Sequence, residues 1–447
     1  MRKVLIVSPR FPPTNAADLH RVRVSVAHYR SFGWEPTILC IDPATADCID
    51  DPELAQSLPE NLPVIRVPAW SEAKCRRFGF GQLGYRSLLP LYRAGCRLLR
   101  REHPAVVFFS TTVFLCFVLG PLWKQRYGCR IVYDFQDPWY NETLPYTPAT
   151  VPGRWWKYRV DQWLARHLEH FALRRADHII AVSQGYVASL SRRYPRLAPA
   201  DFTVVPFAAG DGDYDFLRRR GIRQRVFRAA PGLVRWVYAG RGGADMAPVL
   251  SALFEYIAAL ARDEPRFAER LRLHFVGTDY APVGRARKRV ESLAQQQGIT
   301  ALVEELPARL PYFEALSLYL ESDAILLIGS IDRDYTASKL LTCVASKKPV
   351  LALFHRASLV AAIAERFANV RLATFDESPA EPGFRDQVAR GIAWLRAPSF
   401  DPAAIDAALQ PWSAEELTRR QCAIFDRVST SPALPARLSE VRPQPLR

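Results

Sequence analysis

The chain has, near its start, the stretch Lys3-Val-Leu-Ile-Val-Ser-Pro9, in which four consecutive apolar residues end at a polar, proline-rich segment. Such a run predicts a buried parallel strand followed by a loop. Residues 16–31 then carry apolar side chains at helical spacing, the pattern stops at Gly33, and residues 36–41 form a second strand-like run. A strand, a loop, a helix and a strand within about forty residues predict the opening of a Rossmann-like domain.

The same alternation of strand and helix patterns runs through the chain twice. The first series continues with predicted strands at residues 105–109, 130–134, 178–182 and 202–206. The pattern weakens and then starts again with predicted strands at residues 234–239, 271–276, 324–328 and 350–354. Two successive α/β domains of Rossmann-like type are therefore expected, facing a central cleft that is the default ligand site. The predicted segments are a first domain at 1–207, a linker at 208–230, a second domain at 231–410, a last helix at 411–428 that packs back on the first domain, and a disordered tail at 429–447.

Composition narrows the classes of protein. The chain has 447 residues, of which 49% are hydrophobic, so it can form full cores and is not disordered as a whole. Its formal net charge of +15 favours anionic partners. None of the eight cysteines forms a C-x-x-C pair, which favours buried, reduced thiols in a cytosolic protein. The apolar stretch at residues 106–123 is better explained by a buried strand and helix than by a membrane span.

Glycines and cations follow the strands of the second domain. Gly240 and Arg241 close its first strand, where backbone N–H groups and a guanidinium suit a phosphate, although a plain glycine-rich turn is the alternative. Gly277 and Thr278 end the next strong strand, where the glycine could admit a nucleotide base against the backbone. A tight turn explains these residues equally well. Lys339 follows Ser338, a candidate helix cap, and a cation in a first helical turn suggests a bound anion. A solvated lysine remains the alternative.

Carboxylates follow strands in both domains. Asp334 lies in the loop before Ser338, where it could face a sugar hydroxyl, and Asp137 follows the strand at residues 130–134, where it could act as a base or cap a turn. His20 lies early in the predicted helix at residues 16–31 and faces either the cleft or water. Two D-x-D pairs, at residues 211–213 and 332–334, are common by chance, so no metal site is expected.

Basic and aromatic residues alternate in two parts of the first domain. Residues 66–101 hold nine basic residues and one acidic residue, with leucines between them, and residues 155–159 repeat the mixture. Such stretches suit an anionic membrane surface, and a solvated basic helix face is the alternative. No nucleic-acid-reading module is evident, so nucleic acid is not an expected partner.

Several of these segments together resemble bacterial glycosyltransferases of the GT-B fold, in the large retaining group called family 4. The most specific are the segments at residues 132–139, similar to a D-F-R-D-P-W motif with Gln136 in place of arginine, and at residues 337–350, similar to P-S-K-L-x-E-Y-L-A-x-G-K-P-V. The resemblance covers nearly all of residues 1–428. It also includes residues 3–13, 33–39, 176–183, 238–241 and 275–277.

The resemblance implies a site and also shows departures from the family. It places donor phosphates and nucleotide beside Gly240, Arg241, Gly277, Thr278, Ser338 and Lys339, and donor sugar hydroxyls beside Asp334. Thr342 stands where the family has a glutamate that holds the donor ribose, and Cys343 stands where it has a tyrosine. The lysine that usually follows Arg241 is absent, because Asp245 and Met246 occupy that region, and Lys339 is expected to supply the second cation.

The resemblance implies a hexosyltransferase-type enzyme. It would move a sugar from a nucleotide-diphosphate donor to a glycan or lipid-linked acceptor, with retention of configuration and without a metal or other cofactor. Asp137, His20 and Asp334 are the expected catalytic residues, with Asp137 and His20 on the acceptor side. The expected location is cytoplasmic, at the inner face of the plasma membrane, with peripheral contact to anionic lipid, in surface-polysaccharide synthesis. Two alternatives stay open: a GT-B protein that binds a glycan or partner without catalysis, and a nucleotide-sugar epimerase.

Overall fold

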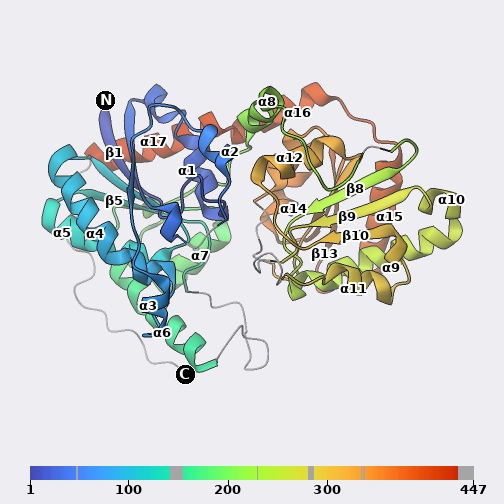
Figure 1. Ribbon diagram of the computed structural model, residues 1–447, viewed down its shortest axis with the longest axis horizontal. Coiled ribbons are helices and arrows are strands. Elements are labelled where there is room, and N and C mark those ends of the chain that lie inside the picture. The colour runs from blue at the N-terminus through green and yellow to red at the C-terminus, as the bar shows by residue number, and fades with distance from the viewer. Residues whose placement is uncertain are drawn as a thin grey trace. The chain divides into compact units, whose positions relative to one another are not determined.

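The chain divides into two compact units. A computed structural model describes residues 1–46, 49–140, 155–228, 230–279, 286–333, 335 and 338–430. Unit 1 contains Met1–Ala208 and Ala414–Arg447, and unit 2 contains Ala209–Ser413. Each unit has one parallel sheet with helices between successive strands, which confirms the expected pair of Rossmann-like α/β domains (Figure 1). The cleft expected between them stays a prediction.

Unit 1 is built on a sheet of seven parallel strands in the order β3-β2-β1-β4-β5-β6-β7. The strands are β1 (Arg2–Val7), β2 (Trp34–Ile41), β3 (Val64–Val67), β4 (Val106–Ser110), β5 (Arg130–Phe135), β6 (His178–Ala181) and β7 (Phe202–Val204). The helices are α1 (His20–Ser25), α2 (Pro52–Gln56), α3 (Glu72–Arg76), α4 (Leu83–Glu102), α5 (Leu119–Tyr127), α6 (Trp155–Leu173), α7 (Gln184–Arg193) and α17 (Ala414–Thr430). Short 3-10 turns are η1 (Ala17–Leu19), η2 (Tyr29–Phe32), η3 (Pro43–Thr45), η4 (Phe114–Val118) and η5 (Pro199–Asp201).

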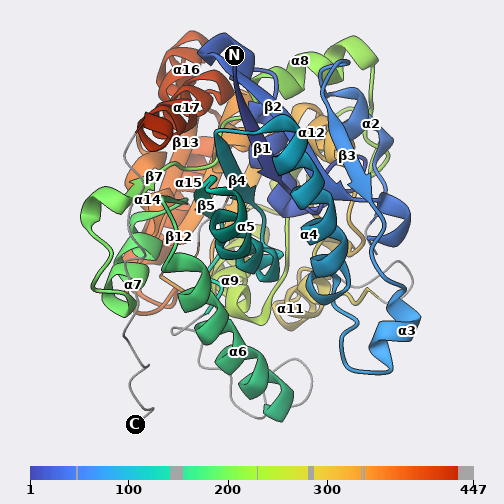
Figure 2. The same ribbon diagram turned by 90° about the vertical axis from the view of Figure 1, so that its left-hand side faces the viewer.

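Both faces of this sheet are covered, because successive strand side chains point to opposite faces. Leu5 and Val7 belong to the core that includes residues of α4 and α5, which lie over the sheet in Figure 2. Val4 and Ile6 belong to the core on the other face, which α17 closes. The ring of Phe425 on α17 lies 5.4 Å from Trp34, 6.1 Å from Tyr29 and 5.3 Å from Phe108. The helix after unit 2 is thus an integral layer of unit 1.

Unit 2 is built on a sheet of six parallel strands in the order β10-β9-β8-β11-β12-β13. The strands are β8 (Val234–Ala239), β9 (Leu271–Val276), β10 (Val303–Leu306), β11 (Ala324–Ile328), β12 (Val350–His355) and β13 (Val370–Phe375). The helices are α8 (Asp211–Arg220), α9 (Ala247–Asp263), α10 (Pro265–Ala268), α11 (Val290–Gln296), α12 (Tyr312–Glu321), α13 (Leu340–Ala345), α14 (Leu359–Ala364), α15 (Pro382–Arg396) and α16 (Pro402–Leu409), with the turns η6 (Ala244–Met246), η7 (Thr300–Leu302) and η8 (Gln410–Trp412).

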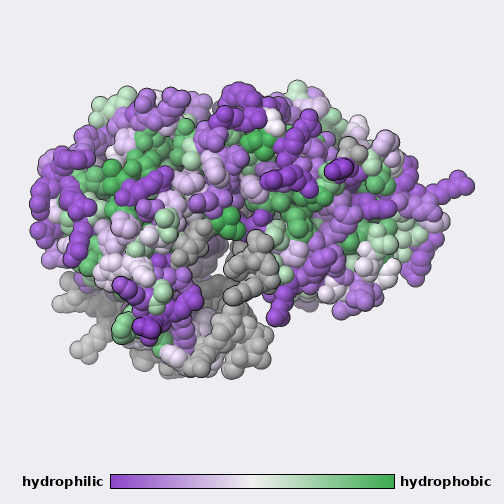
Figure 3. Space-filling view, in the orientation of Figure 1, coloured by the Kyte–Doolittle hydropathy of each residue, from purple (hydrophilic) through white to green (hydrophobic). Residues whose placement is uncertain are grey.

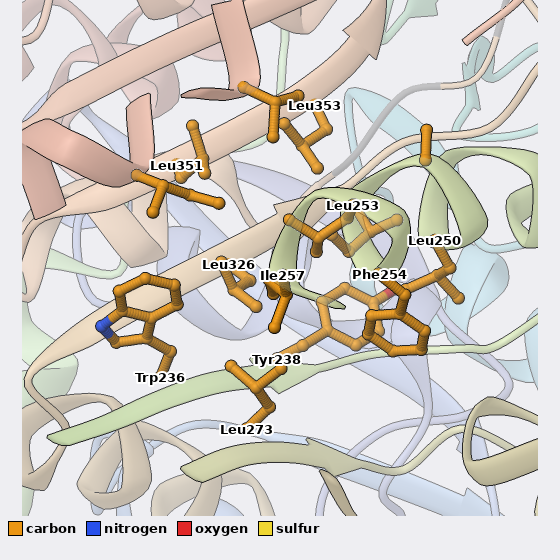
Figure 4. Close-up of a cluster of buried hydrophobic side chains, with 14 of the residues drawn as sticks. Trp236, Tyr238, Leu250, Leu253, Phe254, Ile257, Leu273, Leu326, Leu351 and Leu353 are labelled. Carbon is orange, nitrogen blue, oxygen red and sulfur yellow. The ribbon is translucent and has the colours of Figure 1, made fainter. Parts of the chain in front are cut away.

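The core of unit 2 lies between the sheet and α9. Figure 4 shows Tyr238 of β8 beside Phe254 and Ile257 of α9, with Trp236 further along the same strand, and all four are buried. Among the described residues, one helical segment, Ala244–Asp263, is long and apolar enough to cross a membrane by length and composition. Its apolar side chains belong to this core, which explains its composition. The face of the chain shown in Figure 3 is mostly hydrophilic.

The predicted linker at residues 208–230 is largely wrong, since it contains α8, which belongs to unit 2. Tyr214 and Leu217 of α8 are buried, the ring of Phe216 lies 4.6 Å from that of Phe313, and Gly221 ends the helix at φ 64°. The segment resembles a polar linker in sequence because three arginines end the helix.

Other boundaries also differ from the predictions. The helix predicted at residues 16–31 is broken into η1, α1 and η2. β13 and α14–α16 were not predicted individually. The predicted disordered tail lies outside the described residues except for Ser429 and Thr430, which end α17.

Candidate functional site

The turn after β8 brings a lysine ammonium against a glycine. Lys339 precedes α13, and its Nζ donates to the carbonyl oxygen of Ala239 at 2.5 Å. A Cβ on Gly240 would lie 2.9 Å from this Nζ and 2.6 Å from the hydroxyl of Tyr238. The N–H of Gly240 donates to Val276 within the sheet, so this glycine serves to admit the lysine rather than to offer an N–H.

The ammonium of Lys339 lies in a group of three cations. Burial lowers the pKa of Lys339 from its usual value to about 8, and Cys343, which raises it, is outweighed by burial together with Arg309 and Arg241. The residue as a whole is exposed. The lowered pKa therefore reflects the surroundings of the ammonium group, which contacts Ala239 and Gly240. Like charges in this arrangement favour an anion, since an anion would relieve both their repulsion and their poor solvation.

Arg241 is held in place by a carboxylate and an aromatic ring. Its Nη1 and Nη2 donate to Asp245 Oδ1 and Oδ2 at 2.6 and 2.7 Å. Its guanidinium lies 4.8 Å from the ring centre of Tyr335. Burial raises the pKa of Asp245, but the bonds from Arg241 and Ser330 outweigh it, so the pKa of this carboxyl is below its usual value. Asp245 therefore stays charged and fixes the direction of Arg241.

Arg309 is the member of the cation group that sequence reasoning missed. Gly277 adopts φ 70°, in the left-handed region that favours glycine, and a Cβ there would lie 3.7 Å from the Cα of Arg309. Its N–H donates to Leu306 at 2.9 Å, which ties the end of β9 to the segment that carries Arg309. No motif marks Arg309, so only the pairing of β9 with β10 reveals it.

Thr278 takes part in the internal support of the unit. Its hydroxyl donates to Glu305 Oε1, and its carbonyl accepts from the N–H of Gly242 at 2.7 Å. Glu305 in turn accepts from the N–H groups of Val290 and Glu291 at 2.9 Å, at the start of α11. The Thr278 hydroxyl thus positions a helix beside the glycine turn.

The segment around α13 contains the remaining predicted donor residues. Ser338 is exposed, and Lys339 rather than Ser338 stands at the cap position of α13. Thr342 is half-buried, and its carbonyl accepts from the Tyr214 hydroxyl at 2.8 Å. Cys343 is buried below the lysine, and burial raises the pKa of its thiol to about 12. Asp334 lies outside the described residues.

The predicted acceptor residues lie after the strands of unit 1. Asp137 is exposed beyond β5, and His20, which opens α1, is half-buried and accepts from Arg23 Nε at 3.3 Å through its Nδ1. Their segments are neighbours, because Gln136 Nε2 donates to the carbonyl of Asp18 at 3.2 Å. This contact brings the two predicted segments to the same end of the sheet.

A buried polar cluster supports this end of unit 1, and sequence reasoning missed it. Arg21 Nε pairs with Asp134 Oδ2 at 2.7 Å, and both side chains are at most 3% exposed. The same oxygen accepts from Ser110 at 2.7 Å and from Gln136 at 3.0 Å. Arg21 also donates to the carbonyl of Val205 at 2.7 Å. Burial raises the pKa of Asp134, although Arg21 and these hydrogen bonds oppose the rise.

Asp213 shows that one predicted D-x-D pair has a structural use, since it is buried and accepts from the Tyr312 hydroxyl at 2.7 Å. Among the described residues no group of three histidine, cysteine or acidic side chains could hold a metal ion.

Comparisons with known proteins agree with this architecture. Residues 20–208 match the family model of the glycosyl transferase 4-like domain. A search of curated proteins gives no match. The UDP-forming α,α-trehalose-phosphate synthase from Burkholderia xenovorans superposes with a TM-score of 0.62 at 12% identity, covering 96% of this chain and 100% of that chain. Anabaena Alr3699/HepE in complex with UDP (TM-score 0.58, 16% identity) and a glycosyltransferase from Rickettsia africae (0.58, 13%) each cover 96% and 100%.

These matches define the fold of the chain. It has the GT-B fold, and residues 20–208 are similar to the glycosyl transferase 4-like domain, in agreement with the resemblance to family 4-like glycosyltransferases drawn from the sequence.

Proposed function

We propose that this chain is a nucleotide-sugar-dependent glycosyltransferase whose donor diphosphate binds at the cation group of unit 2. The observation that carries the proposal is the position of the Lys339 ammonium against Gly240, where burial, Arg309 and Arg241 lower the pKa of the lysine. A diphosphate would supply the missing negative charge, and cations there would stabilise a nucleoside diphosphate as it leaves. The structure of HepE with UDP, a protein of the same fold, supports a nucleotide donor.

The remaining roles in the proposal come from the sequence resemblance. Asp334 holds donor sugar hydroxyls, Asp137 and His20 line the acceptor side, and Ser338, Gly277 and Thr342 border the donor nucleotide. The reaction is hexosyl transfer with retention, to a glycan or lipid-linked acceptor, without a metal ion or other cofactor. Proton NMR of the product, which reports the anomeric configuration, tests retention.

Arg309 offers the sharpest test, because no sequence motif marks it. Arg309→Gln is expected to weaken UDP binding roughly tenfold in calorimetry, by removing a charged partner of the diphosphate. Arg266→Gln is the matched control, since Arg266 is an exposed arginine of unit 2 on α10, and this variant is expected to bind UDP normally. If the wild type, Arg309→Gln and Arg266→Gln bind UDP with equal affinity, the proposed location of the diphosphate is contradicted.

The lowered pKa of Lys339 predicts that donor affinity depends on pH. The pKa of about 8 means that the unliganded lysine loses its proton as the pH passes through that value. If only the charged form binds, the dissociation constant for UDP rises by roughly tenfold or more between about pH 7 and about pH 9.5. Lys339→Arg keeps its charge over this range and is expected to show a flat profile. A pH-dependent variant and a flat wild type would overturn the assignment.

A second candidate function rests on Thr342. Its side chain has no carboxylate to accept hydrogen bonds from a ribose, which favours a protein that binds a glycan or nucleotide without transfer. Incubation with a panel of radiolabelled nucleotide sugars separates the candidates. Release of nucleoside diphosphate with an acceptor indicates transfer, a changed sugar without a glycan product indicates epimerisation, and binding without turnover indicates the second candidate.

A further inference from the structure

Unit 1 exposes large apolar side chains in two places at the same end. Trp70, Phe78 and Phe80 flank α3 and are 50%, 77% and 54% exposed. Trp156, Val160 and Trp163 on α6 are 60%, 52% and 57% exposed. We call these six side chains the aromatic surface. Figures 1 and 2 both show α3 and α6 at the same end of unit 1.

The first half of α6 extends beyond the core that its second half joins. Its buried residues are Ala165, Glu169, Ala172 and Leu173, and none of residues 155–164 is buried. Trp156, Val160 and Trp163 are spaced by four and three residues, so they share one face of the helix. A helix that needed only to cover the core would not require two exposed tryptophans on this face.

Tyr85, at the start of α4, contacts the part of the aromatic surface that flanks α3. The ring of Phe80 lies 5.4 Å from that of Tyr85. The pKa of Tyr85 is raised, first by burial and then by the carboxylate of Asp161 on α6. The aromatic surface thus consists of two patches at the same end of unit 1.

Positive charge accompanies these side chains. Residues 70–80 contain Lys74, Arg76 and Arg77 against one acid, Glu72, for a net charge of +2. Residues 155–167 contain Lys157, Arg159 and Arg166 against Asp161, again +2. Lys74, Arg77, Lys157 and Arg159 are all exposed. Tryptophan with flanking lysine and arginine is the combination that suits the boundary between anionic headgroups and acyl chains.

We propose that the aromatic surface docks unit 1 on an anionic lipid bilayer. The apolar rings enter the headgroup region, and the flanking cations contact lipid phosphates and carboxylates. The leucines of α4 take no part, since Leu91, Leu98 and Leu99 lie in the core of unit 1. The basic residues predicted from the sequence at 66–101 therefore contribute through α3 and its loop rather than through an apolar face of α4. This inference goes beyond the proposed function and does not depend on donor binding.

Co-sedimentation with lipid vesicles tests the proposal. The full chain is expected to bind vesicles of phosphatidylcholine mixed with phosphatidylglycerol at least about tenfold more strongly than vesicles of phosphatidylcholine alone, and high salt is expected to reduce the difference. Binding that is equal for both vesicles, or absent from both, overturns it. Binding of a single-stranded oligonucleotide without binding of vesicles also overturns it, because the basic residues would then serve nucleic-acid binding.

Matched variants locate the binding surface. The double change Trp156→Ser and Trp163→Ser, and separately the triple change of Lys74, Arg76 and Arg77 to Gln, are each expected to lower vesicle affinity at least about tenfold. The controls are Leu122→Ser, an exposed leucine on α5, and the change of Arg218, Arg219 and Arg220 of α8 to Gln, which removes three exposed arginines from unit 2. If the control variants lose as much vesicle affinity as the variants of the aromatic surface, the proposed location of the binding surface is wrong.

UDP affinity, measured in parallel, keeps this proposal separate from the proposed function. The variants of the aromatic surface are expected to bind UDP as the wild type does, because the cation group lies in unit 2. Vesicle binding without UDP binding would support the docking surface and contradict the proposed donor site.

Discussion

Lys339→Met is expected to weaken UDP binding by about 10- to 100-fold, the largest single effect on the proposed donor site. A hydrogen bond to a charged group contributes about 1.5–3 kcal/mol, and this lysine is the cation whose ammonium Gly240 admits to the end of β8. Methionine retains the length of the side chain and removes the charge. Calorimetry with UDP measures the change.

The same variant carries a second, independent expectation. Because the folded-state pKa of Lys339 lies below its usual value, the charged lysine opposes folding below about pH 8, and this cost disappears as the pH rises toward the unfolded value. Lys339→Met is therefore expected to raise the melting temperature without UDP while it lowers the affinity for UDP. Lys347→Met is the control, since Lys347 forms an exposed ion pair with Asp406. A variant that loses stability and keeps its affinity would indicate a structural lysine.

Arg21→Met is expected to destabilise unit 1 by about 3–5 kcal/mol, because it leaves the Asp134 carboxylate buried without its charged partner. Chemical denaturation followed by circular dichroism measures the loss. Adding Asp134→Asn removes the unpaired charge and keeps an oxygen that can accept from Ser110 and Gln136. The double variant is therefore expected to recover more than half of the lost stability.

An exposed pair of similar chemistry provides the comparison for this result. Arg30 and Glu35 form an ion pair at 2.6 Å with the arginine 49% exposed, so Arg30→Met is expected to change the stability little. Equal effects of Arg21→Met and Arg30→Met would mean that burial of the Arg21–Asp134 pair has no energetic consequence. Failure of the double variant to recover would place the loss in the Arg21 bond to Val205 instead.

The strands could be predicted because they are buried on both faces. β8, β9 and β11 were predicted with the bounds that the structure has, since a parallel strand between two helix layers is a continuous apolar run. α8 could not be predicted in the same way, because Asp211, Asp213 and Asp215 are interspersed with its apolar residues and three arginines follow Leu217. Its buried face is visible only when α12 and α13 are in place.

The candidate site was predictable where a residue follows a strand in sequence. Gly240 and Arg241 do so, and Lys339 was predicted because it stands at the start of a helix; the structure brings Lys339 against Gly240. Arg309 could not be predicted because its position depends on the pairing of β9 with β10. The bond between Asp245 and Arg241 could not be predicted because it depends on the direction of the two side chains. Arg21 and Asp134 are distant in sequence, and a charged pair inside an apolar segment has no local pattern.

The position of α17 has a consequence for synthesis on the ribosome. Phe425 closes the core beside Trp34 and Phe108, yet it is translated only after all of unit 2. Until then the nascent chain carries an uncovered apolar sheet face, whereas every strand of unit 2 has already left the exit tunnel or is about to leave it. Unit 2 is thus able to finish folding first, whereas the core of unit 1 is completed only after the last helix has been translated.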